Sequence, residues 1–249
     1  MNQTRVGIAG WGNPPTHRGK RADTQSHLAY YAQHFDCVEI NSSFYRSHRR
    51  ETYQRWRDST TARFRFAVKM PLSITHESGL RNARRELSGF FAEIEGLGPK
   101  LAVIFIQLPP SLEFTARTVR TFLQRLPRLP DLHVVCEPRH MSWFSKSADA
   151  VLLRAGVSRA AVDPAIIDAA AVPGGARQFA YYRWHGSPRM YYSSYRAAHL
   201  TSLAATLSEA EPREAWCIFD NTARYAAWRN AAYLESALLR ARRAARPRD

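Results

Sequence analysis

Leu101-Ala-Val-Ile-Phe-Ile-Gln107 is a run of six apolar residues closed by a glutamine. A segment that is apolar at every position fits a strand buried on both faces, and such strands are typical of parallel sheets covered by helices. The run has the length of a strand and falls far short of the roughly 20 apolar residues that cross a bilayer. It therefore predicts a buried parallel sheet, and we expect no membrane partner.

Seven further segments resemble this run, and helical patterns separate most of them. The eight predicted strands are Arg5–Gly10, Cys37–Asn41, Phe64–Lys69, Leu101–Gln107, His133–Glu137, Ser158–Asp163, Phe179–Trp184 and Ala215–Asp220. Strands that alternate with helices favour a parallel sheet, and eight of them close a barrel. An open doubly wound sheet often begins with GxGxxG, which the G-I-A-G-W-G of residues 7–12 does not match. We therefore predict an α/β fold, a single parallel eight-stranded (β/α)8 TIM barrel.

Helices are expected in most connections between these strands, the first opening with Thr24 as its N-cap. They are Thr24–His34, Arg49–Arg57, Arg84–Glu95, Ala116–Leu126, Ala148–Ala155, Tyr195–Ser208 and Ala223–Ala241. The sixth connection, Pro164 to Gln178, contains Pro173-Gly-Gly175 and no helical pattern, so it is expected to be irregular. Residues 1–241 are thus predicted to form the barrel, and the arginine-rich residues 242–249 a flexible basic tail.

The chain carries a formal net charge of +15, with 32 arginines against four lysines among its 249 residues. This balance could mark a nucleic-acid-binding protein, or it could be a solvated basic surface that reflects a biased composition. The basic residues are dispersed apart from a few pairs and the tail, which favours the solvated surface. Nucleic-acid binding or processing stays the alternative function.

Three cysteines, Cys37, Cys136 and Cys217, lie in separate apolar runs without CxxC spacing. Such a sparse and odd set favours free buried thiols in a reducing compartment. The N-terminus also lacks a basic stretch followed by an apolar one, so no secretory signal is expected. We predict a cytoplasmic protein, with no oligomeric state assigned.

Polar residues fall at the end of almost every predicted strand. In a barrel these ends meet at one face, and that face carries the active site of barrel enzymes. Glu39 and Asn41 share one side of their strand, as do Arg183 and His185 of another. Two interpretations of Glu39 are open: a base or ligand for substrate, or a partner in a buried ion pair with Lys69 or Arg183.

The residues expected at this face divide into two groups by the chemistry of their side chains. Those able to move protons or attack a substrate are assigned catalytic roles, namely Glu39, Lys69, Glu137, His140 and His185. Those able to bind or stack on a substrate are Asn41, Tyr45, His76, Gln107, Arg139, Trp143, Arg183, Tyr195 and Asn221. For His140 a backbone-capping role is the alternative, and for the aromatic residues a place over the barrel core.

A metal site was weighed at the same face, because three histidines and several carboxylates lie there. No HxH or HExxH spacing occurs, and two arginines and a lysine nearby disfavour a bare cation. We therefore predict neither a metal nor another cofactor. The expected partner is a small anion held by Arg139 and Arg183, whose guanidinium groups match phosphate or carboxylate oxygens.

Several of these segments, taken in order, resemble the YecE-like family, known as domain of unknown function 72. The segments are Val6–Trp11, Tyr30–Ala32, Val38–Asn41, Phe44–Arg46, Phe66–Lys69, Ile74–His76, Gln107–Pro110, Glu137–His140, Ser142–Trp143, Arg183–Gly186, Asn221 and Asn230–Ala231. The resemblance implies a TIM barrel and no established reaction.

The sequence departs from the family pattern in two places. Residues 13–22 are shortened and basic where the family carries a further Trp-Gly loop and a Phe-Tyr-Pro stretch, and Asp220-Asn221 stands where an asparagine pair is usual. Both departures lie near the expected pocket, so ligand specificity could differ. Two carboxylates, imidazoles and a cationic rim fit an enzyme or ligand-binding protein for a small phosphorylated, carboxylated or carbohydrate-like anion. Fold alone assigns no reaction.

Overall fold

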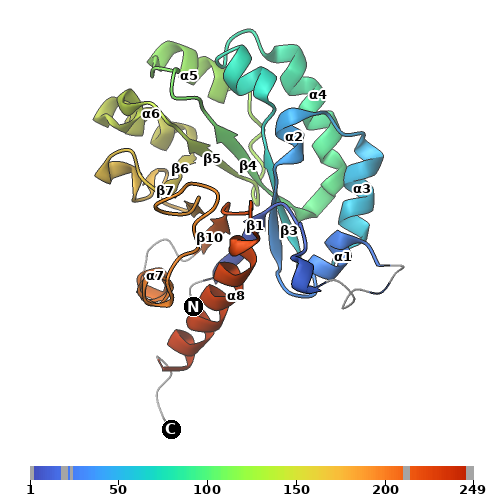
Figure 1. Ribbon diagram of the computed structural model, residues 1–249. Helices are drawn as coiled ribbons and strands as arrows, with labels where there is room; N and C mark the ends of the chain where they lie inside the picture. The colour runs from blue at the N-terminus through green and yellow to red at the C-terminus, as the bar shows by residue number, and fades with distance from the viewer. Residues whose placement is uncertain (1–2, 18–21, 23–24, 210–213, 245–249) are drawn as a thin grey trace.

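A computed structural model of the chain describes residues 3–17, 22, 25–209 and 214–244. Ten strands form one mostly parallel sheet with helices outside it (Figure 1). The strands are β1 Gln3–Ala9, β2 Cys37–Ile40, β3 Arg65–Lys69, β4 Leu101–Gln107, β5 His133–Glu137, β6 Val157–Arg159, β7 Ala161–Asp163, β8 Gly174–Gly175, β9 Ala180–Trp184 and β10 Glu214–Phe219. Their order across the sheet is β7-β9-β10-β1-β2-β3-β4-β5-β6-β8.

The predicted count of eight strands needs correction at the sixth, which is divided at Ala160. Its first part, β6, pairs with β5, whereas its second part, β7, pairs with β9. The Ala160 amide donates to the Cys136 carbonyl across the break, at 2.9 Å. One continuous segment therefore bridges the two ends of the parallel sheet, which curves into a nearly closed, barrel-like form. The remaining strand, β8, runs antiparallel to β6.

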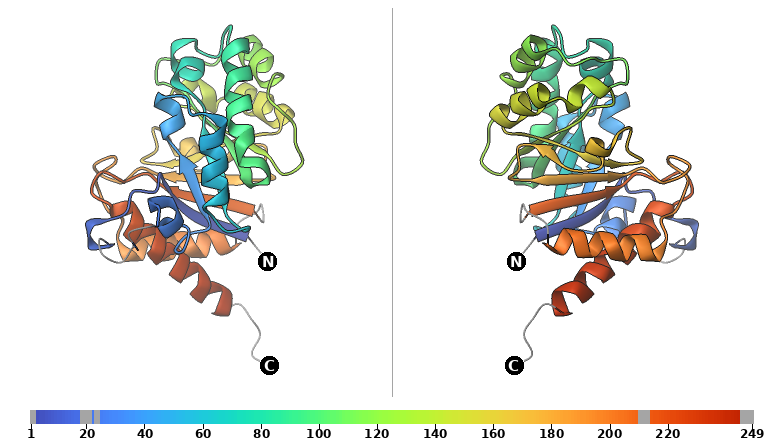
Figure 2. Two further views of the ribbon diagram at one scale, coloured as in Figure 1. Left: turned by 90° about the vertical axis from the view of Figure 1, so that its right-hand side faces the viewer. Right: turned by 90° about the vertical axis from the view of Figure 1, so that its left-hand side faces the viewer.

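Eight α-helices accompany the strands within the described ranges. They are α1 His27–Tyr31, α2 Ser42–Tyr45, α3 Arg50–Asp58, α4 Arg84–Ile94, α5 Ala116–Leu123, α6 Lys146–Ala155, α7 Ala197–Glu209 and α8 Ala226–Ala244. In Figure 2, two opposite views show α8 running past the edge of the strands. No helix among the described residues is both long and apolar enough to span a bilayer.

Helix boundaries follow local capping chemistry. The Ser145 hydroxyl accepts from the Ala148 amide at the start of α6, and Gly156 ends that helix with φ 70°, where a side chain would be strained. The first helix begins at His27 with Ser26 as its N-cap, and the expected cap Thr24 lies outside the described residues. The sixth connection has no α-helix between residues 164 and 179, as predicted.

At the other end of the chain, α8 continues three residues beyond its predicted end at Ala241. Residues 242–244 of the predicted basic tail are therefore helical, and residues 245–249 lie outside the described part.

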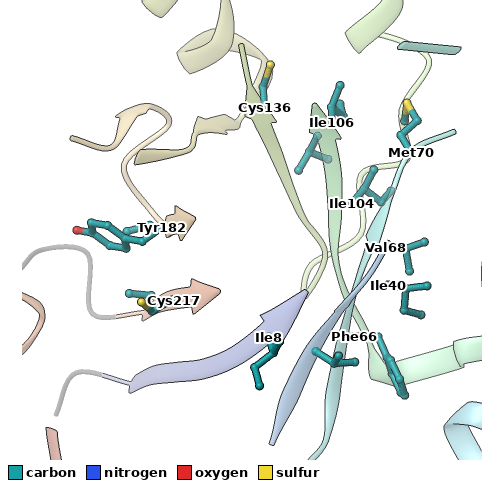
Figure 3. Packing of buried hydrophobic residues seen from close by; sticks show 14 of the residues in the cluster. Ile8, Ile40, Phe66, Val68, Met70, Ile104, Ile106, Cys136, Tyr182 and Cys217 are labelled. Atoms are coloured by element: carbon teal, nitrogen blue, oxygen red, sulfur yellow. The ribbon is translucent and has the colours of Figure 1, made fainter. Parts of the chain in front are cut away.

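Alternate residues of each strand enter two separate cores. Outward residues such as Ile104 and Ile106 of β4 join the large cluster between sheet and helices, part of which Figure 3 shows. Inward residues such as Val103 and Phe105 join a smaller cluster inside the barrel. This two-sided burial is what the apolar run 101–107 predicts. The cysteines at 37, 136 and 217 are free and buried, as expected.

Candidate functional site

Inward-facing positions become polar where the strands reach their C-terminal ends. Buried polar residues stand there at the ends of five strands and in the two positions just after β9 and β10: Glu39, Lys69, Gln107, Glu137, Arg183, His185 and Asp220. Because side chains alternate along a strand, each lies two residues beyond another inward residue of its own segment. That residue is apolar or aromatic in every case but that of His185, where it is Arg183. The strand ends therefore gather these side chains, as predicted for a barrel.

Arg183 occupies the centre of this cluster and is 0 % exposed. Its Nη2 and Nε donate to Glu39 Oε1 and Oε2 at 2.7 and 3.1 Å, and its Nη1 donates to Glu137 Oε2 at 2.8 Å. Nη2 also donates to Asp220 Oδ2 at 3.0 Å. The guanidinium lies 4.5 Å from the centroid of the Phe105 ring. Three carboxylates hold the pKa of Arg183 well above its usual range although burial opposes the charge.

The sequence predicts that Arg183 binds an external anion, whereas in this geometry its donors are directed at groups of the protein. A guanidinium has five N–H donors, and carboxylates of the protein occupy four donor directions here. The remaining donor of Nη1 faces His185 Nε2 at 3.5 Å. Glu39 therefore forms a buried ion pair, which was one of its two interpretations, and its partner is Arg183. The Tyr181 hydroxyl donates to Glu39 Oε2 as well, at 2.8 Å.

Glu137 is the second centre of the cluster. Its Oε1 accepts from Gln107 Nε2 at 2.7 Å and from Arg139 Nε at 3.1 Å, and it lies 3.5 Å from His185 Nε2. Burial favours the neutral acid, but Arg183 and His185 outweigh burial and hold the pKa of Glu137 well below its ordinary value. Glu137 is therefore ionised at neutral pH in the folded protein.

His185 is held between two carboxylates. Its Nδ1 lies 3.0 Å from Asp220 Oδ2, opposite the contact with Glu137. Burial is the largest effect on the imidazolium and disfavours it, as does Arg183, yet Glu137 and Asp220 together outweigh both and raise the pKa of His185. Against the same burial, Arg183 and His185 lower the pKa of Asp220. Both nitrogens of the imidazole are thus engaged inside the protein.

Lys69 is the exception in the cluster. The residue is only 6 % exposed, and across the described residues its ammonium has neither a hydrogen bond nor an ion pair. Nζ lies 4.0 Å from the centroid of the Phe44 ring, a cation–π contact. Burial, together with Arg183, lowers the pKa of Lys69 to about 8, although Glu39, Glu137 and Asp220 act in the opposite direction.

Four other predicted residues lie near this lysine and around the cluster. His76 packs edge-on against Phe44 at 5.0 Å, and burial, Lys69 and Arg139 lower its pKa. Tyr45 also packs edge-on against Phe44, at 4.9 Å, but is 78 % exposed. Arg139 contacts the hydroxyl of Tyr191 at 3.4 Å. Asn41 keeps a side-chain oxygen that is sealed from solvent and has no partner in the described part of the chain.

The structure gives the other four predicted residues framework contacts instead. His140 caps the 3-10 turn Met141–Phe144 through the Ser142 amide, so the capping interpretation is the one observed. Trp143 is 1 % exposed and its Nε1 donates to the Leu112 carbonyl. The Tyr195 hydroxyl donates to Asp163 and accepts from the Gly186 amide. Asn221 Nδ2 donates to Ser193 O and Asn230 Oδ1.

Two members of the cluster were not among the predicted site residues. Asp220 follows β10 at the inward parity of Trp216 and Ile218, and Tyr181 precedes Arg183 by two positions on β9. The period of two that placed Arg183 and His185 on one side of their strand would also have identified Asp220 and Tyr181 as members of the cluster. No group of three or more His, Cys, Asp or Glu side chains suited to a metal occurs in the described part of the chain.

These features define an α/β barrel-like protein with a buried charged cluster at the C-terminal ends of its strands. The chain belongs to the family described as "Protein of unknown function DUF72", whose model matches residues 5–249. It is 31% identical over 164 residues to the UPF0759 protein YecE of Escherichia coli K12, covering 66% of this chain and 58% of that protein. The UPF0759 protein YunF of Bacillus subtilis is 28% identical over 146 residues, which are 56% of this chain and 52% of YunF. The chain thus spans less than two thirds of the length of the curated relatives it matches.

Two solved structures share the fold over nearly the whole chain. A DUF72 family protein of Thermotoga maritima, TM1631, gives a TM-score of 0.77 at 22% identity, covering 95% of this chain and 99% of that one. A DUF72 family protein of Enterococcus faecalis, EF0366, gives 0.75 at 21% identity, covering 96% and 98%. At this identity the likeness concerns the fold.

Proposed function

We propose that the protein is an enzyme or ligand-binding protein that takes a small anion at the C-terminal ends of its strands, with Lys69 and Arg139 as the anion-binding groups. The observation that carries the proposal is the unpaired ammonium of Lys69. A cation that is almost buried and has no counter-ion is costly, and a bound anion would remove that cost.

The balance of charge supports an anion rather than a cation. Three carboxylates, Glu39, Glu137 and Asp220, face Arg183 and are bound to it. Lys69 and Arg139 add two further positive charges, and the raised pKa of His185 favours a third. The three carboxylates are shared among Arg183, Arg139 and His185, so Lys69 is the cation of the cluster that has no carboxylate of the described residues within ion-pair distance.

Arg139 can reach a ligand in a way that Arg183 cannot. Its side chain is 26% exposed, its Nε is bound to Glu137, and its Nη2 contacts Tyr191 at 3.4 Å. Nη1 has no hydrogen-bond partner within the described ranges. The guanidinium is thus fixed at one edge by the protein and offers N–H donors at the other, an arrangement suited to carboxylate or phosphate oxygens.

Lys69 also supplies a group that exchanges protons near neutrality. With burial lowering its pKa to about 8, the amine is close to the range in which general acid–base catalysis is efficient. Glu137 and Asp220 stay ionised, so they hold His185 and Arg139 in place rather than donate protons.

Anion titrations followed by thermal unfolding test the binding proposal. Phosphate, sulfate and lactate are the probes, and Lys69→Met and Arg139→Met are the variants. Lys146→Met removes the same charge from an exposed position of α6 and is the matched control. An anion at 100 times its Kd stabilises the folded state by about 2.7 kcal/mol. We expect this gain in the wild type and the control and its loss in both site variants. Equal gains in all four proteins would contradict the proposal.

The nucleic-acid alternative would use basic hollows of the surface, of which one lies beside α2 and α3 around Arg46, Arg49 and Arg55 and two lie at the other end of the barrel. Two adjoining hollows are lined by arginines and no acidic residue, with Arg120, Arg128 and Arg154 around one and Arg128, Arg154 and Arg177 around the other. They lie where α5 and α6 end, next to the N-terminal ends of the strands. Neither of these two hollows includes a residue of the charged cluster, and we favour the small anion.

A further inference from the structure

The four lysines of this chain stand out because 32 other basic positions are arginine. Three of these lysines lie in the described part of the chain. For two of them, Lys100 and Lys146, the choice of lysine over arginine is readily explained. Lys100 Nζ donates to Arg57 O, Thr60 O and Thr60 Oγ1, a fan of donors that suits a compact ammonium. Lys146 is exposed on α6, where either basic residue serves. Lys69 has neither the fan of acceptors nor the exposure.

An arginine at position 69 would serve an anion-binding role at least as well as a lysine. A guanidinium presents more donors than an ammonium and grips carboxylate or phosphate with two parallel hydrogen bonds. What an arginine cannot do is lose its proton and act as a nucleophile. In a chain so biased towards arginine, an unpaired and nearly buried lysine beside Arg183 indicates that an amine is needed there.

The surroundings of Nζ leave the nitrogen without a bound acceptor. One side is the face of the Phe44 ring, whose centroid lies 4.0 Å away; this contact favours the charged form, whereas burial favours the neutral amine. No acceptor in the described part of the chain binds the nitrogen, and Nζ is not among the polar atoms sealed from solvent. Burial lowers the pKa of Lys69 to about 8, so on the order of a tenth of the amine is neutral at pH 7.

We propose that Lys69 Nζ is a nucleophile that forms an imine with a small carbonyl compound bearing an anionic group, such as a 2-oxo acid. This proposal rests on the proposed function, because Arg139 would hold the anionic group of the same substrate. It names the substrate class and gives Lys69 a covalent role at that site.

The covalent step balances without a co-reactant. The lone pair of Nζ forms a bond to the carbonyl carbon while the π pair of the C=O bond moves to oxygen, and one proton passes from the nitrogen to that oxygen to give a neutral carbinolamine. The nitrogen loses a proton, and the hydroxyl group leaves as water with one proton added while the C=N bond forms. Protonation of that nitrogen gives an iminium ion, which can accept the electron pair of a bond adjacent to the former carbonyl carbon.

Reductive trapping tests this step directly. The intact protein is incubated with pyruvate, or with the smaller glyoxylate, and sodium cyanoborohydride, and modified lysines are located by peptide mass spectrometry. Lysine 146 is the internal control within the same molecule. Because the neutral fraction of an ordinary lysine is far smaller, we expect Lys69 to be alkylated on the order of 100-fold faster at pH 7. The rate should level off above pH 8.

Two comparisons separate this proposal from the anion site on which it rests. Lactate carries the anionic group without the carbonyl, and Lys69→Arg keeps the charge without the nucleophile. Stabilisation by both acids, with trapping by pyruvate that disappears in Lys69→Arg, supports both proposals. Stabilisation without faster trapping at Lys69 than at Lys146 overturns the imine and leaves the anion site standing. Absence of both stabilisation and selective trapping overturns both.

Discussion

Inside the barrel, aromatic side chains pack against one another near the N-terminal ends of the strands. A few residues further along the same strands, ion pairs hold the interior together. Phe179 stacks on His133 with centroids 4.0 Å apart, and Tyr181 stacks between Phe105 and Trp216 at 5.5 and 6.2 Å. Beyond Tyr181 on β9 stands Arg183 with its three carboxylates.

The two regions differ in the property of a side chain that stabilises them. The aromatic region needs volume and shape, so it tolerates an orphan such as the buried Trp216 Nε1. The charged region needs donors matched to acceptors, because an unpaired buried charge costs several kcal/mol. Tyr181 belongs to both, with its ring in the stack and its hydroxyl on Glu39. Lys69 departs from the rule of the charged region, and for that reason it marks the candidate site.

The largest expected effect is at Arg183. Arg183→Met keeps the length of the side chain but leaves Glu39, Glu137 and Asp220 without their shared partner. Breaking a buried ion pair typically costs about 3–5 kcal/mol, and we expect a loss of that order in the free energy of unfolding measured with urea. Arg120→Met, on the exposed face of α5, should change it by less than about 0.5 kcal/mol. Equal losses in the two variants would remove the distinction between buried and surface arginines.

Tyr181 belongs to both the aromatic and the charged region, and Tyr181→Phe separates the role of its ring from that of its hydroxyl. The ring and its stacking remain, and only the hydroxyl that donates to Glu39 Oε2 is lost. A hydrogen bond to a charged group contributes about 1.5–3 kcal/mol, so we expect a loss in that range by urea unfolding. A loss below about 0.5 kcal/mol would show that Arg183 alone satisfies Glu39.

The charged region should also be sensitive to pH through His185. Its pKa is raised in the folded protein, so its stabilising contribution is fully present below its unfolded pKa of 6.5 and is lost as pH rises through the folded value. The difference in unfolding free energy between wild type and His185→Gln should therefore be largest near pH 6 and shrink towards pH 9. Lys69 titrates in both proteins and cancels in this difference. A difference that grows with pH would contradict the assignment.

The aromatic and apolar region should respond least to a change of shape at constant volume. Ile218→Leu alters the branching of a fully buried inward side chain on β10. Volume-conserving swaps usually cost less than about 1.5 kcal/mol, and this one should show no dependence on pH. Urea unfolding at pH 6 and pH 9 provides the measurement. A cost that matches Arg183→Met would mean that packing at this end is as specific as pairing at the other.

Much of the barrel could be predicted because strands leave a local mark in the sequence. The apolar runs of β4 and β5 predicted their bounds to the residue, and the period of two placed Arg183 and His185 on one side of their strand. The sixth strand was harder. Its division at Ala160 depends on which neighbours lie on either side, since β6 pairs with β5 and β7 with β9. No local pattern records a change of partner.

The candidate site also has one part that follows from local sequence and another that depends on tertiary contacts. The sequence by itself determined which polar residues meet, because the C-terminal ends of parallel strands share one face and alternate residues point inward. Only the tertiary structure decided how they pair. Glu39 was free in sequence to pair with Lys69 or Arg183, and it binds Arg183, while His140 and Trp143 turn to backbone carbonyls and amides. Pairing depends on distances of a few ångströms between side chains from distant strands, and those distances exist only once the sheet has curved round. The lysine left over by that pairing is the residue on which the proposed chemistry rests.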